Sequence, residues 1–580
     1  MTRCLDYAIG KGPKLYEEIV RRMQARSTAR PFNRRTFMVG GIGAAAGMAA
    51  PPLFAQTPSA PIATPVFRTT PFTLGIASGE PLPDGVVLWT RLAPHPFEVQ
   101  GGMNPDPVQV RWQVASDEAM TRIVQQGVAV AEAHWGHSVH VEVEGLEPDR
   151  PYWYRFTCGS EESPVGRTKT APAAGSTPDR FRFAFASCQS WAQGLYTAYR
   201  DLAQQDVDLV VHLGDYIYES SIGLGDQLRP GDYSGHLLTT PKTLEDYRNR
   251  YALYKLDPHL QEAHRVAPWL VTWDDHEVDN NYFGEIIRDL PVAQALLELR
   301  AAAYQAYYEH QPLRKESRPS GPDLQLFRHR SFGNLIEFNV LDTRQYRSPQ
   351  GTSCNAELRA EGEGFCPDSL DPERTLLGER QKSWLTDRFE SATARWNMLA
   401  QQIPFARIDN EADPNLASFG GREMDKWDGY AFERDQVASA MARAGAAREF
   451  MPIVITGDVH ANYVWDLKSD WDDPSDATVF GTEFVGTSIS SNGDEALDEG
   501  GFTTECGGRN GNVHNHLFDN HRGYVLCEVT ADCWESTFRV MPTVLDDNAE
   551  ASTLSSFVVE HGRPGAQVAT SCEERTLDAG

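Results

Sequence analysis

The sequence predicts an α/β layered domain preceded by a small all-β domain, and three features of the chain support this prediction. From about residue 180 onward, short apolar segments alternate with segments that have helical spacing of apolar residues. Residues 70–172 instead alternate Val, Trp, Tyr and Phe with polar residues and contain no convincing helix. A length of 580 residues also suggests two or more domains. We therefore expect two regions of different structural class.

The region 70–172 is predicted to be an antiparallel β-sandwich similar to a fibronectin-type module. Pro, Gly and Asp turns separate its strands, of which the clearest are VVLWTRL, VQVRWQV, HVEVEGL and PYWYRFTCG. The segment 171–178, rich in Pro and Ala, is the predicted linker to the next domain.

Residues 180–560 form the predicted α/β domain, and residues 561–580 the predicted C-terminal tail. Spaced apolar positions and many Ala, Leu, Glu and Arg residues favour helices in five segments, namely 197–205, 243–254, 291–310, 379–392 and 434–447.

The first 55 residues resemble a twin-arginine export signal. Arg34 and Arg35 precede a weakly apolar run at 39–50, and a possible cleavage site follows Ala55. The run is short and rich in Gly and Ala, so a membrane anchor is the less favoured alternative. We expect export to a periplasm or to the medium by the twin-arginine translocation machinery, with no integral membrane segment in the mature chain.

The charge of the chain restricts its partners. The formal net charge is −28, and removal of residues 1–55, with nine basic and three acidic side chains, would make it −34. Phosphate backbones and anionic lipids repel such a surface unless a local basic patch or cations intervene. We expect no stable nucleic-acid partner, and a solvated acidic surface explains most of this charge.

Nine cysteines in a chain of this length do not make a disulfide scaffold. In an exported protein Cys354 and Cys366 are a plausible disulfide, and Cys506 with Cys572 is a weaker one. Cys188 differs, because it follows the alternating strand pattern of residues 181–187. It is either a small buried apolar residue or part of a site at the end of that strand.

Three segments are apolar and then abruptly polar: VVHLGDYIYE at 210–219, LVTWDDHEVDN at 270–280 and IVITGDVHANY at 453–463. Each reads as a buried strand whose carboxyl end delivers Asp, His or Tyr into a loop, where α/β sheets build their sites. Asp458 and His460 are two residues apart, so on an extended segment both side chains point the same way. One Gly-Asp after a strand is commonly a turn, but three such clusters together predict a metal site and a hydrolase.

The residue types in these segments suit phosphate-ester hydrolysis by two neighbouring metal ions. Asp215 could bridge both ions with its two carboxylate oxygens, and Tyr218 could add a phenolate, for which a ferric ion is the usual reason. Asp275 and His276 are adjacent, so their side chains diverge. One could bind metal while the other faces the substrate as a proton donor.

The chain resembles the PhoD-like alkaline phosphatases, a branch of the calcineurin-like metallophosphoesterases, over essentially the whole mature sequence. The resemblance rests on ten segments in order: LGIASGEPLPDGVVLWTRL, FASCQ, HLGDYIYE, TWDDHEVDNN, LDTRQYR, QQIPFAR, WDGY, ITGDVHANYV, EFVGTSISS and NHLFDNHRGYV. It implies a metallophosphoesterase-like domain with a β-sandwich core flanked by helices. It also implies phosphomonoesterase or phosphodiesterase activity, by attack of a metal-bound hydroxide.

The resemblance further implies two metals, iron and calcium. For iron it implies Asp215 as the bridging ligand, Tyr218 as a tyrosinate, Cys188 in place of the usual first aspartate, and His460. Asp275 replaces the usual asparagine and Asp458 the usual histidine of the second site. Oxygen ligands of this kind agree with calcium.

Two further residues receive roles by this resemblance. His276 would protonate the leaving group, or else act only as a hydrogen-bond partner of other site residues. Arg344 could bind phosphate oxygens bidentately, although a salt bridge to Asp342 is equally compatible with the sequence. A phospholipase D-type diesterase and a catalytically silent binding protein remain the alternative functions.

Overall fold

The computed structural model describes residues 65–221, 229, 239–284, 290–351, 367–408, 424–471, 473, 475–492, 512 and 514–569. The chain divides into two compact units, and the fold and site below belong to the unit formed by Thr64–Ile286 and Leu296–Gly580. Of the other unit, Met1–Ala63 and Ile287–Ala295, only residues 290–295 are described. The predicted signal, 1–55, therefore lies outside the described residues.

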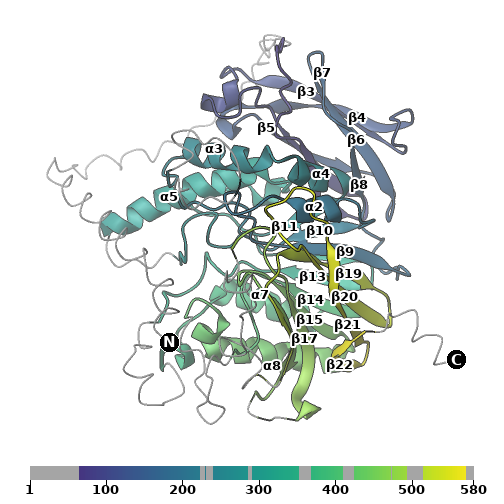
Figure 1. Ribbon diagram of the computed structural model, residues 1–580, viewed down its shortest axis with the longest axis vertical. Coiled ribbons are helices and arrows are strands. Elements are labelled where there is room, and N and C mark those ends of the chain that lie inside the picture. Colours follow the sequence, from purple (N-terminus) through teal and green to yellow (C-terminus); the bar gives the residue numbers. More distant parts are fainter. Residues whose placement is uncertain are drawn as a thin grey trace, which may run out of the picture. The chain divides into compact units, whose positions relative to one another are not determined.

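A ten-stranded sheet carries most of the predicted strand ends (Figure 1). Its strand order is β22 (Arg563–Val568), β21 (Ser552–Glu560), β20 (Cys533–Val540), β19 (Gly523–Val529), β9 (Phe181–Ala186), β10 (Leu209–His212), β11 (Pro268–Val271), β1 (Ile76–Leu82), β2 (Gly85–Arg91), β5 (Ser138–Glu144). Within it β9, β10 and β11 are parallel neighbours, with His212 opposite both Ala186 and Val271. The segments that follow these three strands therefore leave the sheet at the same edge.

A seven-stranded sheet holds the remaining predicted strand end. Its order is β12 (Arg328–Phe332), β13 (Ile336–Val340), β14 (Trp396–Ala400), β15 (Met451–Thr456), β17 (Val479–Val485), β16 (Asn462–Lys468), β18 (Asn515–Asp519). All six residues of β15 are buried, as expected for a parallel strand covered on both faces. This explains why the apolar run at 451–455 is continuous rather than alternating.

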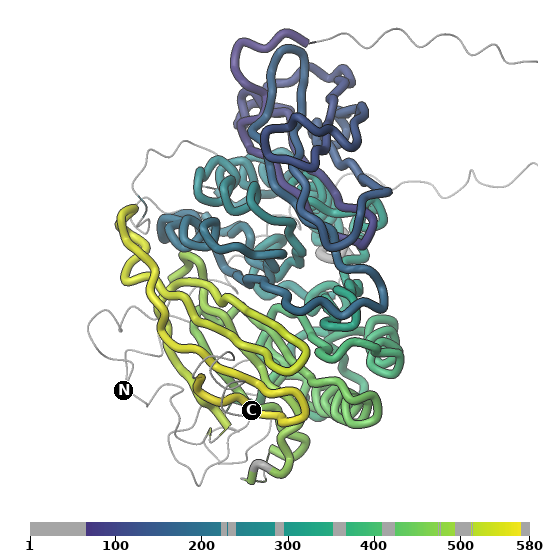
Figure 2. The backbone as a smooth tube through the Cα atoms, turned by 90° about the vertical axis from the view of Figure 1, so that its right-hand side faces the viewer, coloured from purple at the N-terminus to yellow at the C-terminus, as the bar shows by residue number. Residues whose placement is uncertain are grey.

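The two sheets pack face to face and share one apolar core, which contains side chains of β9, β10, β13–β15, β19 and β20. Across this interface the rings of Phe183 and Phe338 lie 5.4 Å apart between centroids. Figure 2 shows the C-terminal strands (yellow) as one layer alongside the green strands of the second sheet. A mixed α/β domain, as predicted, is confirmed.

Helices pack on the outer side of each sheet. One apolar cluster joins the ten-stranded sheet to α2 (Thr197–Leu202), α3 (Leu244–Lys255), α4 (Pro258–Val266), α5 (Leu290–His310). Another joins the seven-stranded sheet to α7 (Gly378–Glu390), α8 (Ala431–Arg448). Over the residues that the structure describes, no helix combines the length and the apolar character that a membrane span requires.

All five predicted helical segments are helical, and α4 was not predicted. Its start has a clear local signal, since the Asp257 carboxylate accepts hydrogen bonds from the backbone N–H groups of His259 and Leu260, and Pro258 occupies the first turn.

The N-terminal region forms a β-structure whose strands belong to two sheets. β4 (Ile123–Ala131), β3 (Val108–Ala115), β6 (Pro151–Cys158), β7 (Glu161–Glu162) and β8 (Gly166–Lys169) form a separate five-stranded sheet. β1, β2 and β5 instead extend the ten-stranded sheet, with Ser78 opposite Pro268 in a parallel pair. A shared core joins the two sets of strands. The fibronectin-like description of this region stays a prediction.

The C-terminal residues differ from the predicted tail. The segment 561–580 begins with β22, which pairs with β21, while residues 570–580 lie outside the described part. Cys533 is disulfide-bonded, and the other described cysteines, Cys158, Cys188 and Cys527, are free. The partner of Cys533 is therefore not among the described residues. Neither predicted disulfide, Cys354–Cys366 or Cys506–Cys572, falls within the described residues.

The core beneath α3 contains a buried lysine. Lys255 is 2% exposed, and its ammonium lies 4.3 Å from the ring centroid of Trp89 and 5.3 Å from that of Tyr216. Burial lowers the pKa of Lys255 from 10.5 to about 7. His212 is also fully buried, and burial lowers its pKa from 6.5 to about 3. The fold thus favours the neutral forms of these basic groups.

This burial predicts a pH dependence of stability that the variant Lys255→Met removes. Between pH 7 and 10.5 the unfolded chain keeps the lysine proton that the folded chain has lost, so folding stability rises with pH by up to ~1.4 kcal/mol per unit. Below pH 7 the lysine is protonated in both states, so the folded protein carries the full free-energy cost of burying the charged ammonium. We expect wild-type stability to rise across this window and that of Lys255→Met to be flatter, measured by urea unfolding at fixed pH values. Parallel curves for the two proteins would show that Lys255 does not carry the effect.

Candidate metal centre

The predicted site residues lie just beyond the carboxyl ends of four strands. Cys188 follows β9, Asp215 follows β10, Asp275 follows β11, and Asp458 follows β15 of the other sheet. The loops after β9 and β10 are joined directly, because the backbone N–H of Cys188 donates to the Gly214 carbonyl at 3.1 Å. The facing sheets thus bring their strand ends to one place.

Four of these residues have left-handed backbone conformations. The φ angles are 58° at Cys188, 55° at Asp215, 67° at Asp458 and 51° at His460. Non-glycine residues rarely adopt such angles, because the side chain crowds the backbone. Strained conformations of this kind gather at functional sites, where surrounding structure holds them. Their concentration here supports a functional role for the strand ends.

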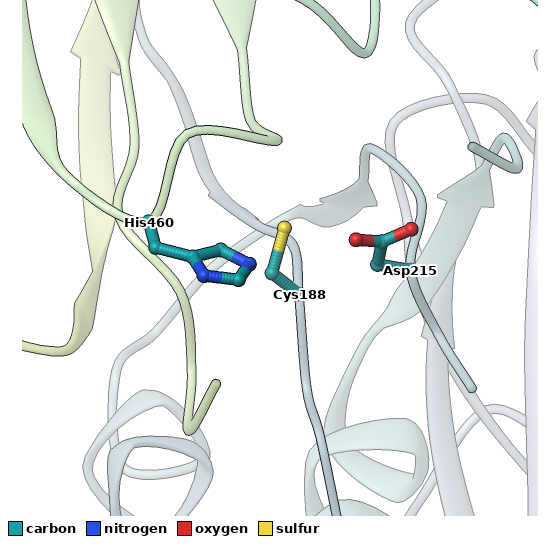
Figure 3. A group of neighbouring side chains, drawn as sticks. All are labelled: Cys188, Asp215 and His460. Atoms are coloured by element: carbon teal, nitrogen blue, oxygen red, sulfur yellow. The ribbon is translucent and has the colours of Figure 1, made fainter. Parts of the chain in front are cut away.

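One group of ligand atoms comes from Cys188, Asp215 and His460, all within 4.8 Å of one another (Figure 3). The Tyr218 hydroxyl adjoins this group, 3.0 Å from Asp215 Oδ2 and 3.1 Å from His460 Nε2. The structure thus brings together the four residues predicted for iron.

The donor set of this group fits a metal ion. His460 Nδ1 lies 2.6 Å from the Asn492 carbonyl, which can only accept, so Nε2 keeps its lone pair for a ligand. Asp215 Oδ1 is buried and has no hydrogen-bond partner within the described residues. Burial and neighbouring negative charge raise the pKa values of Cys188 and Tyr218 well above their ordinary ranges. A cation at this position would stabilise the ionised forms of the thiol and the phenol, which burial disfavours.

A second group shares Asp215 with the first and adds Asp275 and His276, again within 4.8 Å. Burial would raise the pKa of Asp275, but the positive charges of Arg344 and His276 lower it overall. The backbone N–H of Asn281 donates to Asp275 Oδ2 at 2.7 Å, which fixes the carboxylate. Asp215 therefore lies where two clusters of potential ligands meet.

His276 is held by a carboxylate that the sequence analysis did not single out. Its Nδ1 lies 2.7 Å from Glu219 Oε2, and its ring packs on Tyr218 with centroids 4.2 Å apart. Burial would lower the pKa of His276, but the negative charges of Glu219, Asp215 and Asp275 raise it well above its ordinary value. This environment favours the protonated imidazole.

Asp458 belongs to neither group of ligand atoms in the described part of the chain. Its Oδ1 lies 3.5 Å from Arg344 Nη2, and its Oδ2 lies 3.9 Å from the ammonium of Lys426. Burial raises the pKa of Asp458 to about 7, against the opposing effect of these two cations. Its predicted ligand role stays a prediction.

Arg344 is enclosed by carboxylates rather than open to a substrate. Its side chain is 0% exposed, Nε donates to Asp274 Oδ1, and Nη1 lies 2.6 Å from Asp425 Oδ2. Asp342, the ion-pair partner considered from the sequence, instead accepts a hydrogen bond from the Arg344 backbone N–H. The phosphate-binding role of Arg344 is not tested by this arrangement.

Other residues that support the site were not predicted from the sequence. The Glu277 carboxylate accepts from the backbone N–H groups of Asp215 and Tyr216, at 3.1 and 2.7 Å, and so fixes the loop after β10. The Ser491 hydroxyl lies 2.8 Å from the Tyr218 hydroxyl. Glu219 is the last residue of the segment HLGDYIYE, so the sequence placed it near the site. The sequence did not indicate that it pairs with His276.

Residues 183–538 match the family profile described as PhoD-like phosphatase, and residues 57–172 match its N-terminal domain. The chain is 45% identical over 565 residues to alkaline phosphatase D of Bacillus subtilis (strain 168), covering 96% of this chain and 92% of that protein. A solved structure titled "Structure of PhoD" superposes with a TM-score of 0.77 at 44% identity, over 87% of this chain and 94% of the other.

These matches define an enzyme of the phosphatase class. The chain belongs to the PhoD-like phosphatase family, and its N-terminal region is the N-terminal domain of that family. A human collagen fibronectin-type domain gives a TM-score of only 0.12, which carries no argument for the fibronectin-like prediction.

Proposed function

We propose that this chain is an exported alkaline phosphatase that holds iron and calcium at the ends of its central strands. Phosphoric ester hydrolysis follows from its family. The metals, the residue roles and the export are the proposed part. The observation that carries the proposal is the buried group of Cys188, Asp215 and His460, with the Tyr218 hydroxyl in contact with two of its members.

The chemistry of the side chains supports the two metals. A thiolate, an imidazole and a phenolate around one carboxylate suit iron, so Cys188, Asp215, Tyr218 and His460 would hold it. Asp275 and Asp458 offer oxygen donors, which suit calcium. When bound, the two ions would supply positive charge to the phosphoryl oxygens and lower the pKa of a bound water.

The residues of the chain itself would position and protonate the substrate. His276, whose Nδ1 pairs with the Glu219 carboxylate, would donate a proton to the leaving alkoxide. Glu219 would orient the imidazole by accepting from Nδ1, which leaves Nε2 as the proton donor. The guanidinium of Arg344 already pairs with the carboxylates of Asp274 and Asp425. We therefore favour charge compensation over a bidentate phosphate contact as its role.

The variant Glu219→Gln tests the role given to His276. Glutamine can still accept from Nδ1, but it removes the negative charge that keeps the imidazole protonated. We expect kcat to fall roughly 10- to 100-fold for an alkyl phosphate, with KM little changed. The fall should be smaller for p-nitrophenyl phosphate, because its leaving group needs less protonation.

Glu379→Gln on α7 is the matched control, since this carboxylate is exposed and pairs with Lys382. An equal fall for both esters in Glu219→Gln would assign Glu219 a structural role and leave the proton donor to be found elsewhere.

Elemental analysis of the purified mature protein tests the metals directly. We expect iron and calcium, and a visible charge-transfer band from Tyr218 on ferric iron. Zinc without iron or calcium would contradict the ligand assignment. Hydrolysis of a monoester, a diester and phosphatidylcholine by the same preparation then distinguishes a phosphatase from a phospholipase D-type diesterase.

A further inference from the structure

The segment QQIPFAR follows β14, and the proposed function gives it no role. Gln402 in this segment is 0% exposed. A buried amide is unfavourable unless its oxygen and its nitrogen both find hydrogen-bond partners. The side chain of Gln402 makes four hydrogen bonds, and every partner lies just beyond the end of β11 or of β13. These partners are specific to the edge of the sheets where the metal centre lies.

The bonds of Gln402 join the two sheets. Its Nε2 donates to Thr272 Oγ1 at 2.8 Å and to the Leu341 carbonyl at 2.9 Å. Thr272 follows β11 of the ten-stranded sheet, whereas Leu341 follows β13 of the seven-stranded sheet. The Thr272 hydroxyl also donates to the Leu341 carbonyl at 3.0 Å. One buried glutamine therefore connects a strand end of one sheet to a strand end of the other.

The backbone of Gln402 also holds the start of the loop that carries Asp458. The N–H of Gly457, which directly precedes Asp458, donates to the Gln402 carbonyl at 2.9 Å. Thr272, on the other side, lies three residues before Asp275. Gln402 thus contacts both segments from which the proposed calcium ligands leave their sheets.

The proposed iron ligands are held by different contacts. His460 Nδ1 lies 2.6 Å from the Asn492 carbonyl. The Cys188 carbonyl accepts from the backbone N–H of Ser491 at 3.3 Å and from its hydroxyl at 2.8 Å. Both supports come from the segment after β17, and neither involves Gln402. A change at Gln402 should therefore displace the calcium ligands more than these two iron ligands.

We propose that Gln402 is a positioning residue that sets the spacing between Asp275 and Asp458 and thereby the affinity of the enzyme for calcium. This inference rests on the proposed function, because it assumes that these two carboxylates bind calcium. Calcium is held by oxygen atoms at about 2.3–2.6 Å, so carboxylates on two separate sheets can share an ion only at a suitable separation. Residues that orient metal ligands without touching the metal commonly change metal affinity roughly 10- to 100-fold when they are replaced.

The variant Thr272→Val tests the inference without altering the glutamine. Valine keeps the shape of the threonine and removes both hydrogen bonds that its hydroxyl makes across the sheets. The purified enzyme is freed of calcium with EGTA and dialysed against known concentrations of Ca²⁺, which gives the dissociation constant Kd. We expect this Kd to rise roughly tenfold, with the iron content unchanged. Excess calcium should then restore hydrolysis of p-nitrophenyl phosphate to within about twofold of wild type.

Thr343→Val is the matched control. Its hydroxyl donates to Oε1 of the same glutamine at 2.7 Å, and both threonines are buried. Thr343 follows β13, however, so this bond stays within the seven-stranded sheet to which β14 and Gln402 belong. We expect similar falls in the urea midpoint of the two variants, but a Kd for calcium within about twofold of wild type in Thr343→Val. Gln402→Met, which removes all four side-chain bonds, should weaken calcium binding at least as much as Thr272→Val.

An unchanged Kd for calcium in Thr272→Val would overturn the inference. An equal rise of Kd in Thr343→Val would overturn it too, because the amide would then stabilise the fold without setting the spacing of the sheets. Neither result would affect the proposed function. A wild-type enzyme that binds no calcium would instead contradict the proposed metals, and the inference would fail with them.

Discussion

Asp215→Asn should abolish both the activity and the metal content of this phosphatase, with kcat/KM falling roughly a thousandfold or more. Asp215 is the one residue common to the two groups of ligand atoms, Cys188 with His460 and Asp275 with His276. An amide has one oxygen and no negative charge, so it cannot serve two cations. Metal content by elemental analysis and hydrolysis of p-nitrophenyl phosphate are the measurements.

The substitution is also conservative for the backbone. Asp215 has a φ of 55°, and asparagine tolerates this left-handed conformation as well as aspartate does. Loss of function would therefore reflect lost ligation rather than a broken turn. Asp532→Asn, which alters a carboxylate that is 87% exposed, is the control and should leave both quantities unchanged. Full metal content and full activity in Asp215→Asn would mean that the proposed centre is wrong.

Arg344→Met should destabilise the fold by about 3–5 kcal/mol. The guanidinium is fully buried and faces carboxylates of Asp274, Asp275, Asp425 and Asp458. Methionine fills a similar volume but leaves the buried carboxylates of Asp274 and Asp425 without this ion-pair partner. Urea unfolding of the metal-loaded enzyme measures the loss. The control variant Arg443→Met, at an exposed position of α8, should stay within about 0.5 kcal/mol of wild type.

A second variant separates lost charge compensation from lost packing. If uncompensated carboxylates cause the loss, adding Asp274→Asn to Arg344→Met removes one of them and should recover part of the stability. If the double variant is less stable than Arg344→Met alone, packing or hydrogen bonding around the arginine is the larger contribution.

The strand-end residues could be predicted because their signal is local. A buried apolar run that changes abruptly to Gly-Asp marks the end of a strand, and this identified Asp215 and Asp458, with His460 two residues further on. Cys188 needed the further premise that its strand is parallel to and beside the others. Periodicity likewise located the long helices, which have many spaced apolar positions.

Contacts across the chain had no comparable signal. Sequence proximity suggested Asp342 as the partner of Arg344, but the guanidinium pairs with Asp274 and Asp425, which are 70 and 81 residues away. The patterns VVLWTRL and HVEVEGL identified β2 and β5 as strands without revealing their hydrogen-bond partners, because such a pattern does not report which strand lies alongside. Their place in the ten-stranded sheet therefore required the structure.

The neighbours of β9 have a consequence for biosynthesis. Cys188 follows β9, and one of the two hydrogen-bonded neighbours of this strand is β19, with Val525 opposite Phe185. His460 reaches the same centre from the other sheet. Pairing between such distant segments is slow, because a long loop must close before the contacts form. A ribosome must therefore have translated most of the chain before the centre can be assembled, so we expect the metals to enter only after synthesis is nearly complete.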